Sequence, residues 1–350
     1  MRRFRKIVTA MLIACLLTQT VSFSSNAAEK EGVMVPNHTV DVQQSTSEID
    51  VQMPKAGKVT IGEKVKDSEI STDGIHAMGN TAVVKTKSAF IKKMYAYMNA
   101  RTTSFTIVFK GSYKKIYVNN NIQKMFAPVW AMDNKNTSDD FDYLYLTIDS
   151  YRFRIPAYSN NKSVFKFNIK YLESKTQVKK VNTKVKNVLA KLKLSGKSRV
   201  EQIRAIHNYI AETITYDNSL SRFSAYDGLV SSKHTTVCQG YALSFYKMCT
   251  EAGIPCRAVT GYGYDKNGKG VRHAWNIVKI GSQWYYVDTT WDDLDLGIRP
   301  YVYSYFLIGS NKMLKDHSLD AEYKTAAFKK KYPISKTNYN WSLPEGESAS

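Results

Sequence analysis

A helix followed by two strands constrains the fold of this chain more than any other sequence feature. In residues 238–252, apolar side chains recur at helical spacing, and Gly253 stands where such a helix would end. Residues 273–280 and 283–290 have the composition of strands, and the glycine and serine between them predict a two-residue hairpin turn. A helix packed on an antiparallel sheet places this segment in the α+β class.

The predicted turn also fixes which residues face each other across the hairpin. Residue 280 opposes residue 283, so every later pair follows from that first one. In this register, His273 and Asp288 lie on the same face of the sheet as diagonal neighbours, within reach of a hydrogen bond. A turn one residue longer would place them on opposite faces.

Cys238 is predicted to begin the helix that precedes the hairpin. The partial positive charge at a helix N-terminus stabilises a thiolate, which makes the sulfur a usable nucleophile near neutral pH. A carboxylate beside an imidazole fixes its tautomer and stabilises its cation, which in turn stabilises a nearby thiolate. Cys238, His273 and Asp288 are therefore the candidate nucleophile, base and orienting carboxylate. Cys249 and Cys256 lack such a placement and are predicted to be buried structural residues.

Three blocks of residues around these side chains closely resemble the motifs of the bacterial transglutaminase-like family. The similarity implies a papain-like fold in which the blocks carry the Cys, His and Asp of a catalytic triad, and it assigns those roles to Cys238, His273 and Asp288 alone. The wider resemblance extends over roughly residues 198–310. The three blocks are residues 237–242, 273–276 and 284–291.

The chain departs from this pattern in the loop before Cys238. Lys233 and His234 stand there, and no side chain in the loop can be assigned as a second oxyanion donor, so the backbone amide of Cys238 is the one donor that we predict. His207 is predicted to be a packing or surface histidine, and His317 has no predicted role. Three tryptophans, Trp275, Trp284 and Trp291, would either wall an acyl-binding groove or pack in the core.

The resemblance implies a thiol enzyme that acts on an amide through a thioester on Cys238. An amine acceptor would make it a crosslinking transferase, and water would make it a peptidase or amidase; the triad does not choose between them. The alternative is a non-catalytic cell-surface binding module that keeps the fold. No cofactor is expected. No metal is expected either, because the acidic residues near Asp288 lack the glycine and bidentate glutamate of a calcium loop.

The N-terminal residues predict export. Four basic residues precede an apolar stretch, and residues 25–27 resemble a small-residue cleavage site, so we expect a signal peptide over residues 1–27. A lipoprotein anchor at Cys15 is the alternative. No stretch reaches the roughly 20 apolar residues of a membrane span, so a secreted or cell-surface protein without a transmembrane anchor is expected.

The charge of the chain favours anionic partners. Processing after Ala27 would remove four basic residues and no acidic residue, which lowers the formal net charge from +20 to +16. Outside a cell, such a charge suits anionic cell-wall polymers or lipid head groups, although a solvated surface without a partner explains it equally well. Nucleic acid is not expected, because the lysines are spread along the chain and no nucleic-acid motif accompanies them.

The predicted organisation places a papain-like transglutaminase core after a smaller α+β domain. Residues 24–89 contain no Phe, Tyr or Trp, so the segment before the small domain is predicted to be extended or weakly ordered, with a covering prosegment as the alternative. The predicted segments are a signal peptide (1–27), a leader (28–84), the small domain (85–173), the catalytic domain (174–328) and a frayed C-terminal tail (329–350). Within them we predict a strand over residues 143–155 and a helix from residue 198 whose N-terminus has a capping box of Ser198 and Glu201.

Overall fold

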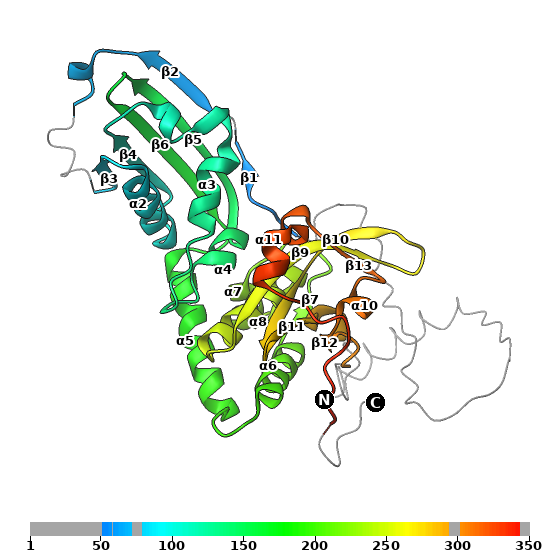
Figure 1. Ribbon diagram of the computed structural model, residues 1–350. Helices are drawn as coiled ribbons and strands as arrows, with labels where there is room; N and C mark the ends of the chain where they lie inside the picture. Colours follow the sequence, from blue (N-terminus) through cyan, green and yellow to red (C-terminus); the bar gives the residue numbers. More distant parts are fainter. Residues whose placement is uncertain (1–50, 58, 72–78, 294–301, 344–350) are drawn as a thin grey trace. The chain divides into compact units, whose positions relative to one another are not determined.

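The computed structural model describes residues 51–57, 59–71, 79–293 and 302–343. These residues form two main sheets with helices packed on them, which confirms the predicted α+β class (Figure 1). The predicted signal peptide and the alternative anchor at Cys15 lie outside the described residues. Among the helices that the structure describes, none is both long and apolar enough to cross a membrane.

The first sheet has the strand order β1-β5-β6-β4-β3, with β2 also paired to β5. Helices α2 (Lys87–Asn99), α3 (Ile122–Trp130) and α4 (Phe141–Leu146) contribute to its core, where aromatic rings of the sheet and of α2 and α3 pack together. Its strands are β1 (Lys55–Ala56), β2 (Thr60–Lys64), β3 (Thr81–Val84), β4 (Ser104–Phe109), β5 (Ile148–Tyr158) and β6 (Ser163–Tyr171).

Two predictions for this region were wrong. The leader contributes β1, β2 and β3, so the sheet begins before residue 85, where the small domain was predicted to start. Main-chain pairing with β5 and β4 holds these strands, and such pairing requires no aromatic side chain. The predicted strand over residues 143–155 begins instead with the helix α4, and β5 starts only at Ile148.

The second sheet has the order β12-β11-β10-β9-β13, and all of its paired strands are antiparallel. Helix α8 (Cys238–Glu251) packs on β10, while α5 (Lys175–Leu192), α6 (Arg199–Thr213) and α7 (Ala225–Leu229) surround α8. The expected helix on an antiparallel sheet is therefore confirmed. The strands are β9 (Cys256–Tyr264), β10 (Gly270–Ile280), β11 (Gln283–Val287), β12 (Phe306–Ile308) and β13 (His317–Leu319).

Buried ion pairs connect the second sheet and α8 to the segment around α4. Lys247 of α8 is fully buried and pairs with Asp139, and its Nζ also donates to Ser138 Oγ at 3.0 Å. Arg257 of β9 binds Asp142 through two parallel hydrogen bonds of 2.7 and 2.9 Å. Such two-point contacts orient both partners, because a planar guanidinium matches a carboxylate.

The C-terminal residues up to 343 are not frayed, contrary to the sequence prediction. Helix α11 (Ala326–Lys331) leads into a segment whose backbone bonds the second sheet: Trp284 donates to Pro333 at 2.9 Å, and Tyr339 donates to Leu307 at 2.9 Å. The ring of Trp341 lies against Phe306, with 4.9 Å between centroids. The aromatic side chains of this segment give it apolar surface to bury, which outweighs its polar composition.

Candidate active site

Cys238 is the first residue of α8, as predicted, and its side chain is fully buried. The helix is buried on all sides over its first twelve residues, so its N-terminus is fixed by packing rather than by a side-chain cap. Gly240 allows this packing, because a Cβ there would lie 2.0 Å from Thr236 Oγ1. The preceding strand β8 (Thr235–Thr236) can therefore pass directly beneath the start of the helix.

His273 lies on β10, and Asp288 follows the last residue of β11. The Nε2 atom of His273 lies 2.6 Å from Oδ2 of Asp288, and both side chains are buried. The other carboxylate oxygen, Oδ1, accepts hydrogen bonds from the backbone amides of Thr290 and Trp291 at 3.1 and 3.2 Å. These bonds hold the carboxylate in one orientation, and the bond at Nε2 leaves Nδ1 of His273 as the ring nitrogen available to the sulfur.

Cys238 and His273 interact. Burial opposes the positive charge on His273, but the Asp288 carboxylate and the Cys238 thiol group, acting through charge and hydrogen bonds, outweigh it and raise the pKa of His273 to about 9. Burial alone would raise the pKa of Asp288, yet His273 and His317 hold it well below its usual range. The structure thus brings the three predicted side chains together, with a carboxylate that stays charged and an imidazole that favours its cation.

Residues 186–289 match the family model described as the transglutaminase-like superfamily, and this match includes Cys238, His273 and Asp288. The chain contains a transglutaminase-like domain. It is similar to kyphoscoliosis peptidase of Mus musculus, 31% identical over 160 residues that make up 40% of this chain and 24% of that protein. The Homo sapiens peptidase is 33% identical over 141 residues, 35% of this chain and 21% of that one. The chain thus spans about a quarter of these curated relatives.

Two solved structures resemble the fold more distantly. One, described as the crystal structure of a TGase, has a TM-score of 0.28 and 12% sequence identity, and the match covers 60% of this chain and 59% of that one. The other is the periplasmic domain of TgpA from Pseudomonas aeruginosa, with a TM-score of 0.27 and 18% identity over 41% of this chain and 60% of that one.

The hairpin of the transglutaminase-like domain has the predicted register, with residue 280 opposite residue 283 and Asn276 opposite Val287. The predicted length of its second strand was wrong. Strand β11 ends at Val287, and Asp288 is the N-cap of helix α9 (Thr289–Asp292), because its side chain accepts the first amides of that helix. The contact with His273 is therefore made from a helix cap and not from a diagonal position on the sheet.

His317, which lies beyond the residues matched by the family model, also binds Asp288, and no role was predicted for it. Its Nε2 lies 3.2 Å from the same oxygen that binds His273, and its Nδ1 lies 2.6 Å from Asp316 Oδ1. Burial lowers the pKa of His317, but these two carboxylates raise it above its ordinary value. The contact depends on pairing between β13 and β9, and no local sequence signal predicts that pairing.

Within the described residues, His273, Asp288 and His317 form a group whose ligand atoms could hold a metal ion. Their spacing fits hydrogen bonds better. The shared oxygen lies 2.6 and 3.2 Å from the two ring nitrogens, which are donor-to-acceptor distances for N–H···O bonds. The protons of these bonds occupy the space that a cation would need.

The three tryptophans, Trp275, Trp284 and Trp291, have different surroundings. Trp275 is buried and stacks on His273, with 5.7 Å between centroids, and Trp291 lies 5.4 Å from the same ring. Trp284 packs against Tyr332, in the same core cluster that contains Trp275. Two of the three therefore enclose the imidazole, which excludes water from one side of it.

His207 packs inside the transglutaminase-like domain. A packing histidine was one of the two predicted alternatives, and a surface histidine was the other. Its Nε2 lies 3.0 Å from Asp292 Oδ2, and both side chains are fully buried. Burial raises the pKa of Asp292 to about 6, although His207 acts in the opposite direction. This second pair connects α6 to α9, the helix that Asp288 caps, and so supports the position of Asp288.

The raised pKa of His273 predicts a pH-dependent stability difference. Because the pKa of His273 is higher in the folded chain than in the unfolded chain, protonation of His273 stabilises the fold. This stabilisation is fully present below the ordinary pKa of 6.5 and is lost as the pH rises through about 9. We compare the free energy of unfolding of wild type with that of His273→Gln. The difference between the two proteins should be larger at pH 6 than at pH 9.5, by on the order of 3 kcal/mol in favour of wild type. Urea unfolding of both proteins at both pH values measures this, and a difference that does not change with pH would contradict it.

Proposed function

We infer that this chain is an exported thiol enzyme that transfers or cleaves the acyl group of an amide through a thioester on Cys238. The observation that carries this proposal is the contact of Cys238, at a helix N-terminus, with a His273 that Asp288 orients. Export rests on the predicted signal peptide. A protein or peptide amide is the proposed substrate, in line with the curated relatives whose names describe a peptidase.

The first half-reaction forms the thioester. The sulfur of Cys238 attacks the amide carbonyl carbon, and the oxyanion that forms is stabilised by the backbone amide of Cys238. The protonated His273 then gives its proton to the leaving nitrogen, the carbon–nitrogen bond breaks, and a neutral amine departs. Asp288 remains charged throughout and stabilises the imidazolium, since its own pKa lies far below neutral.

The second half-reaction releases the acyl group. An amine or a water molecule attacks the thioester carbonyl while neutral His273 accepts its proton, and the Cys238 thiolate leaves. An amine acceptor gives a new amide, which is a crosslink if the amine belongs to a lysine. Water gives a carboxylic acid. The triad performs both reactions, so the acceptor decides between transferase and peptidase.

His317 acts in this proposal as a positioning residue that holds Asp288 for His273. We expect His317→Ala to lower the rate of Cys238 modification by about 10-fold, because one buried hydrogen bond to the carboxylate is lost. His317→Gln keeps a donor amide near the carboxylate and should stay within about threefold of wild type. The measurement is the modification rate from pH 5 to 10, and a purely structural role would lower stability in both variants without moving that pH profile.

A thiol-reactive probe tests the proposal as a whole. Iodoacetamide should modify Cys238 in a pH-dependent way, and His273→Ala should lower that rate by about 10²-fold, since the partner of the thiolate is gone. Modification at the rate of an ordinary thiol, unchanged by His273→Ala, would instead support the alternative of a non-catalytic binding module. The reaction of Cys249 and Cys256 is followed by peptide mapping as an internal reference.

The acceptor is identified by products. The chain is incubated with a glutamine-containing protein and a labelled primary amine; incorporation with release of ammonia indicates a transferase, and new amino termini indicate a peptidase.

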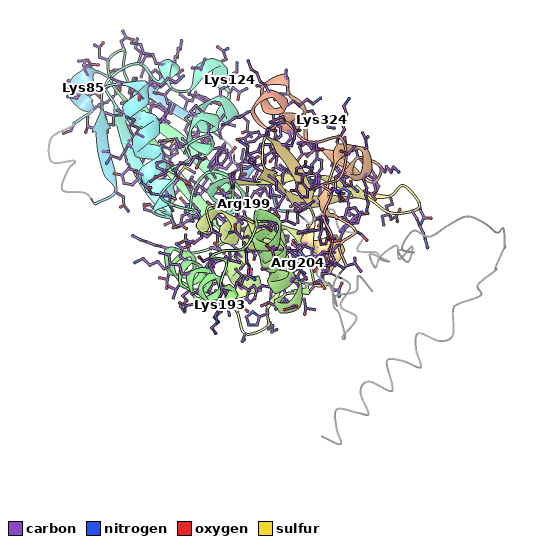
Figure 2. The ribbon with its side chains drawn as sticks, turned by 60° about the horizontal axis from the view of Figure 1, so that its bottom comes forward. Lys85, Lys124, Lys193, Arg199, Arg204 and Lys324 are labelled. Carbon is purple, nitrogen blue, oxygen red and sulfur yellow. The ribbon has the colours of Figure 1, made fainter. Side chains whose placement is uncertain are left out.

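Binding to cell-wall polymers is a separate proposal that rests on charge. Figure 2 shows that the labelled basic side chains come from different elements, for example Lys124 in α3, Arg204 in α6 and Lys324 in η5 (Ala321–Lys324).

A further inference from the structure

The leader reaches the candidate nucleophile. Val51 is 5% exposed and belongs to one apolar cluster with Cys238, Ala242 and Ala274, and Met53 packs against the same cluster. Cys238 itself has no exposed surface. A substrate carbonyl must contact the sulfur, so the residues at this cluster stand where part of a substrate would have to lie.

The next residue of α8, Gln239, binds the main chain of the leader at two points. Its Oε1 accepts a hydrogen bond from the backbone amide of Gln52 at 2.6 Å, and its Nε2 donates to the backbone carbonyl of Gln52 at 3.4 Å. The same Nε2 donates to the carbonyl of Leu146 at 2.6 Å, which fixes the plane of the carboxamide. These are contacts that any extended peptide can make, because they use no side chain of the bound residue.

The leader then continues along the edge of β5 as an added strand. Strand β1 runs parallel to β5, with Lys55 opposite Ser150, and Gly57 donates to the carbonyl of Tyr151 at 2.7 Å. Between the two regions, the side-chain amide of Gln52 donates to Asp149. The fixed carboxamide of Gln239 and the edge of β5 together form a track for an extended polypeptide. This track ends at Cys238.

We propose that this track is the binding site for an extended peptide substrate and that residues 51–57 occupy it in cis, with Gln239 binding the peptide main chain. The proposal rests on the proposed function, since it names the substrate class of the same site. It also gives the leader a role: its release from the track opens Cys238 to a second peptide. In the occupied site, an apolar cluster surrounds the Val51 position, and the carboxylate of Asp149 accepts a hydrogen bond from the side chain at the Gln52 position.

The test is the rate at which iodoacetamide modifies Cys238 in the full chain. Val51→Asp places a charge in the apolar cluster, which disfavours the seated leader, and we expect modification at least 10-fold faster than in wild type. Ile61→Asp is the matched control, because it adds the same charge to the leader on β2, where the side chain is 37% exposed. Its rate should equal that of wild type.

A synthetic peptide of residues 49–57 tests the site itself. In the Val51→Asp chain, this peptide should restore protection of Cys238, and the same peptide with aspartate at position 51 should not. Protection by the peptide should be lost in the double variant Val51→Asp, Gln239→Leu. Equal modification rates in wild type, Val51→Asp and Ile61→Asp, or equal protection by both peptides, would overturn the inference.

The outcomes separate this inference from the proposed function. If Val51→Asp speeds modification and His273→Ala does not slow it in that background, the leader covers Cys238 but the thiol is not activated, and the proposed function fails. If His273→Ala slows modification while Val51→Asp has no effect, the thiol is activated and the peptide track is wrong.

Discussion

Cys238→Ser should abolish acyl transfer, with a loss of more than about 10³-fold and no thioester detectable by mass spectrometry. A serine hydroxyl ionises far less readily than a thiol, so Cys238→Ser cannot form the thiolate–imidazolium pair that helps to raise the pKa of His273. The assay is amine incorporation together with release of new amino termini. It is run with and without Val51→Asp, so that the leader does not limit access of the substrate.

Cys249→Ala is the matched control for this variant. Cys249 lies on the same helix and is also fully buried, in an apolar cluster away from His273. We expect its activity to stay within a few fold of wild type, while its free energy of unfolding falls by about 1 kcal/mol through the lost packing. Activity that survived in Cys238→Ser, or that disappeared equally in both variants, would exclude Cys238 as the nucleophile.

Asp288→Asn should lower activity by roughly 10²–10⁴-fold. The amide keeps an oxygen that can accept from the amides of Thr290 and Trp291, so the cap of α9 can persist. The group that faces His273 is then the side-chain amide NH2 of asparagine, which carries no charge and donates hydrogen bonds. The imidazole then loses the charge that raises its pKa, and its tautomer no longer leaves a basic nitrogen for Cys238.

Asp292→Asn is the control for the orienting carboxylate. Asp292 is a buried aspartate at the end of the same short helix, and it pairs with a different imidazole, that of His207. Its replacement should reduce stability without a comparable loss of activity. The imidazole pKa of His273, followed by NMR, should fall in Asp288→Asn and stay near its wild-type value in Asp292→Asn; the reverse pattern would contradict the assigned roles.

The sequence predicted the parts of the site that depend on local geometry. Cys238 begins its helix, and Ser198 and Glu201 form the predicted capping box of α6. The two-residue turn gives the predicted register of β10 and β11. Each of these features is set by residues within a few positions of one another, so patterns of spacing and turn chemistry were sufficient to predict them.

The parts that were missed depend on contacts between distant residues. Strand β11 ends early because Asp288 caps α9, and a strand and a capped turn have similar composition there. His317 reaches Asp288 through β13, and Val51 reaches Cys238 from 187 residues before it in the chain. The leader and the C-terminal segment were underestimated for one reason: both are held by backbone pairing with strands far away in sequence, for which composition gives no signal.

The ion pairs of Lys247 and Arg257 set a limit on how the transglutaminase-like domain can be excised. A fragment that starts at residue 174 would carry both cations without Asp139 and Asp142, their counter-ions in the intact chain. A buried ammonium without its carboxylate is costly to keep, and burial already lowers the pKa of Lys247 despite the presence of Asp139. The chain upstream of residue 174 is therefore part of what makes the cysteine-bearing helix a stable core element.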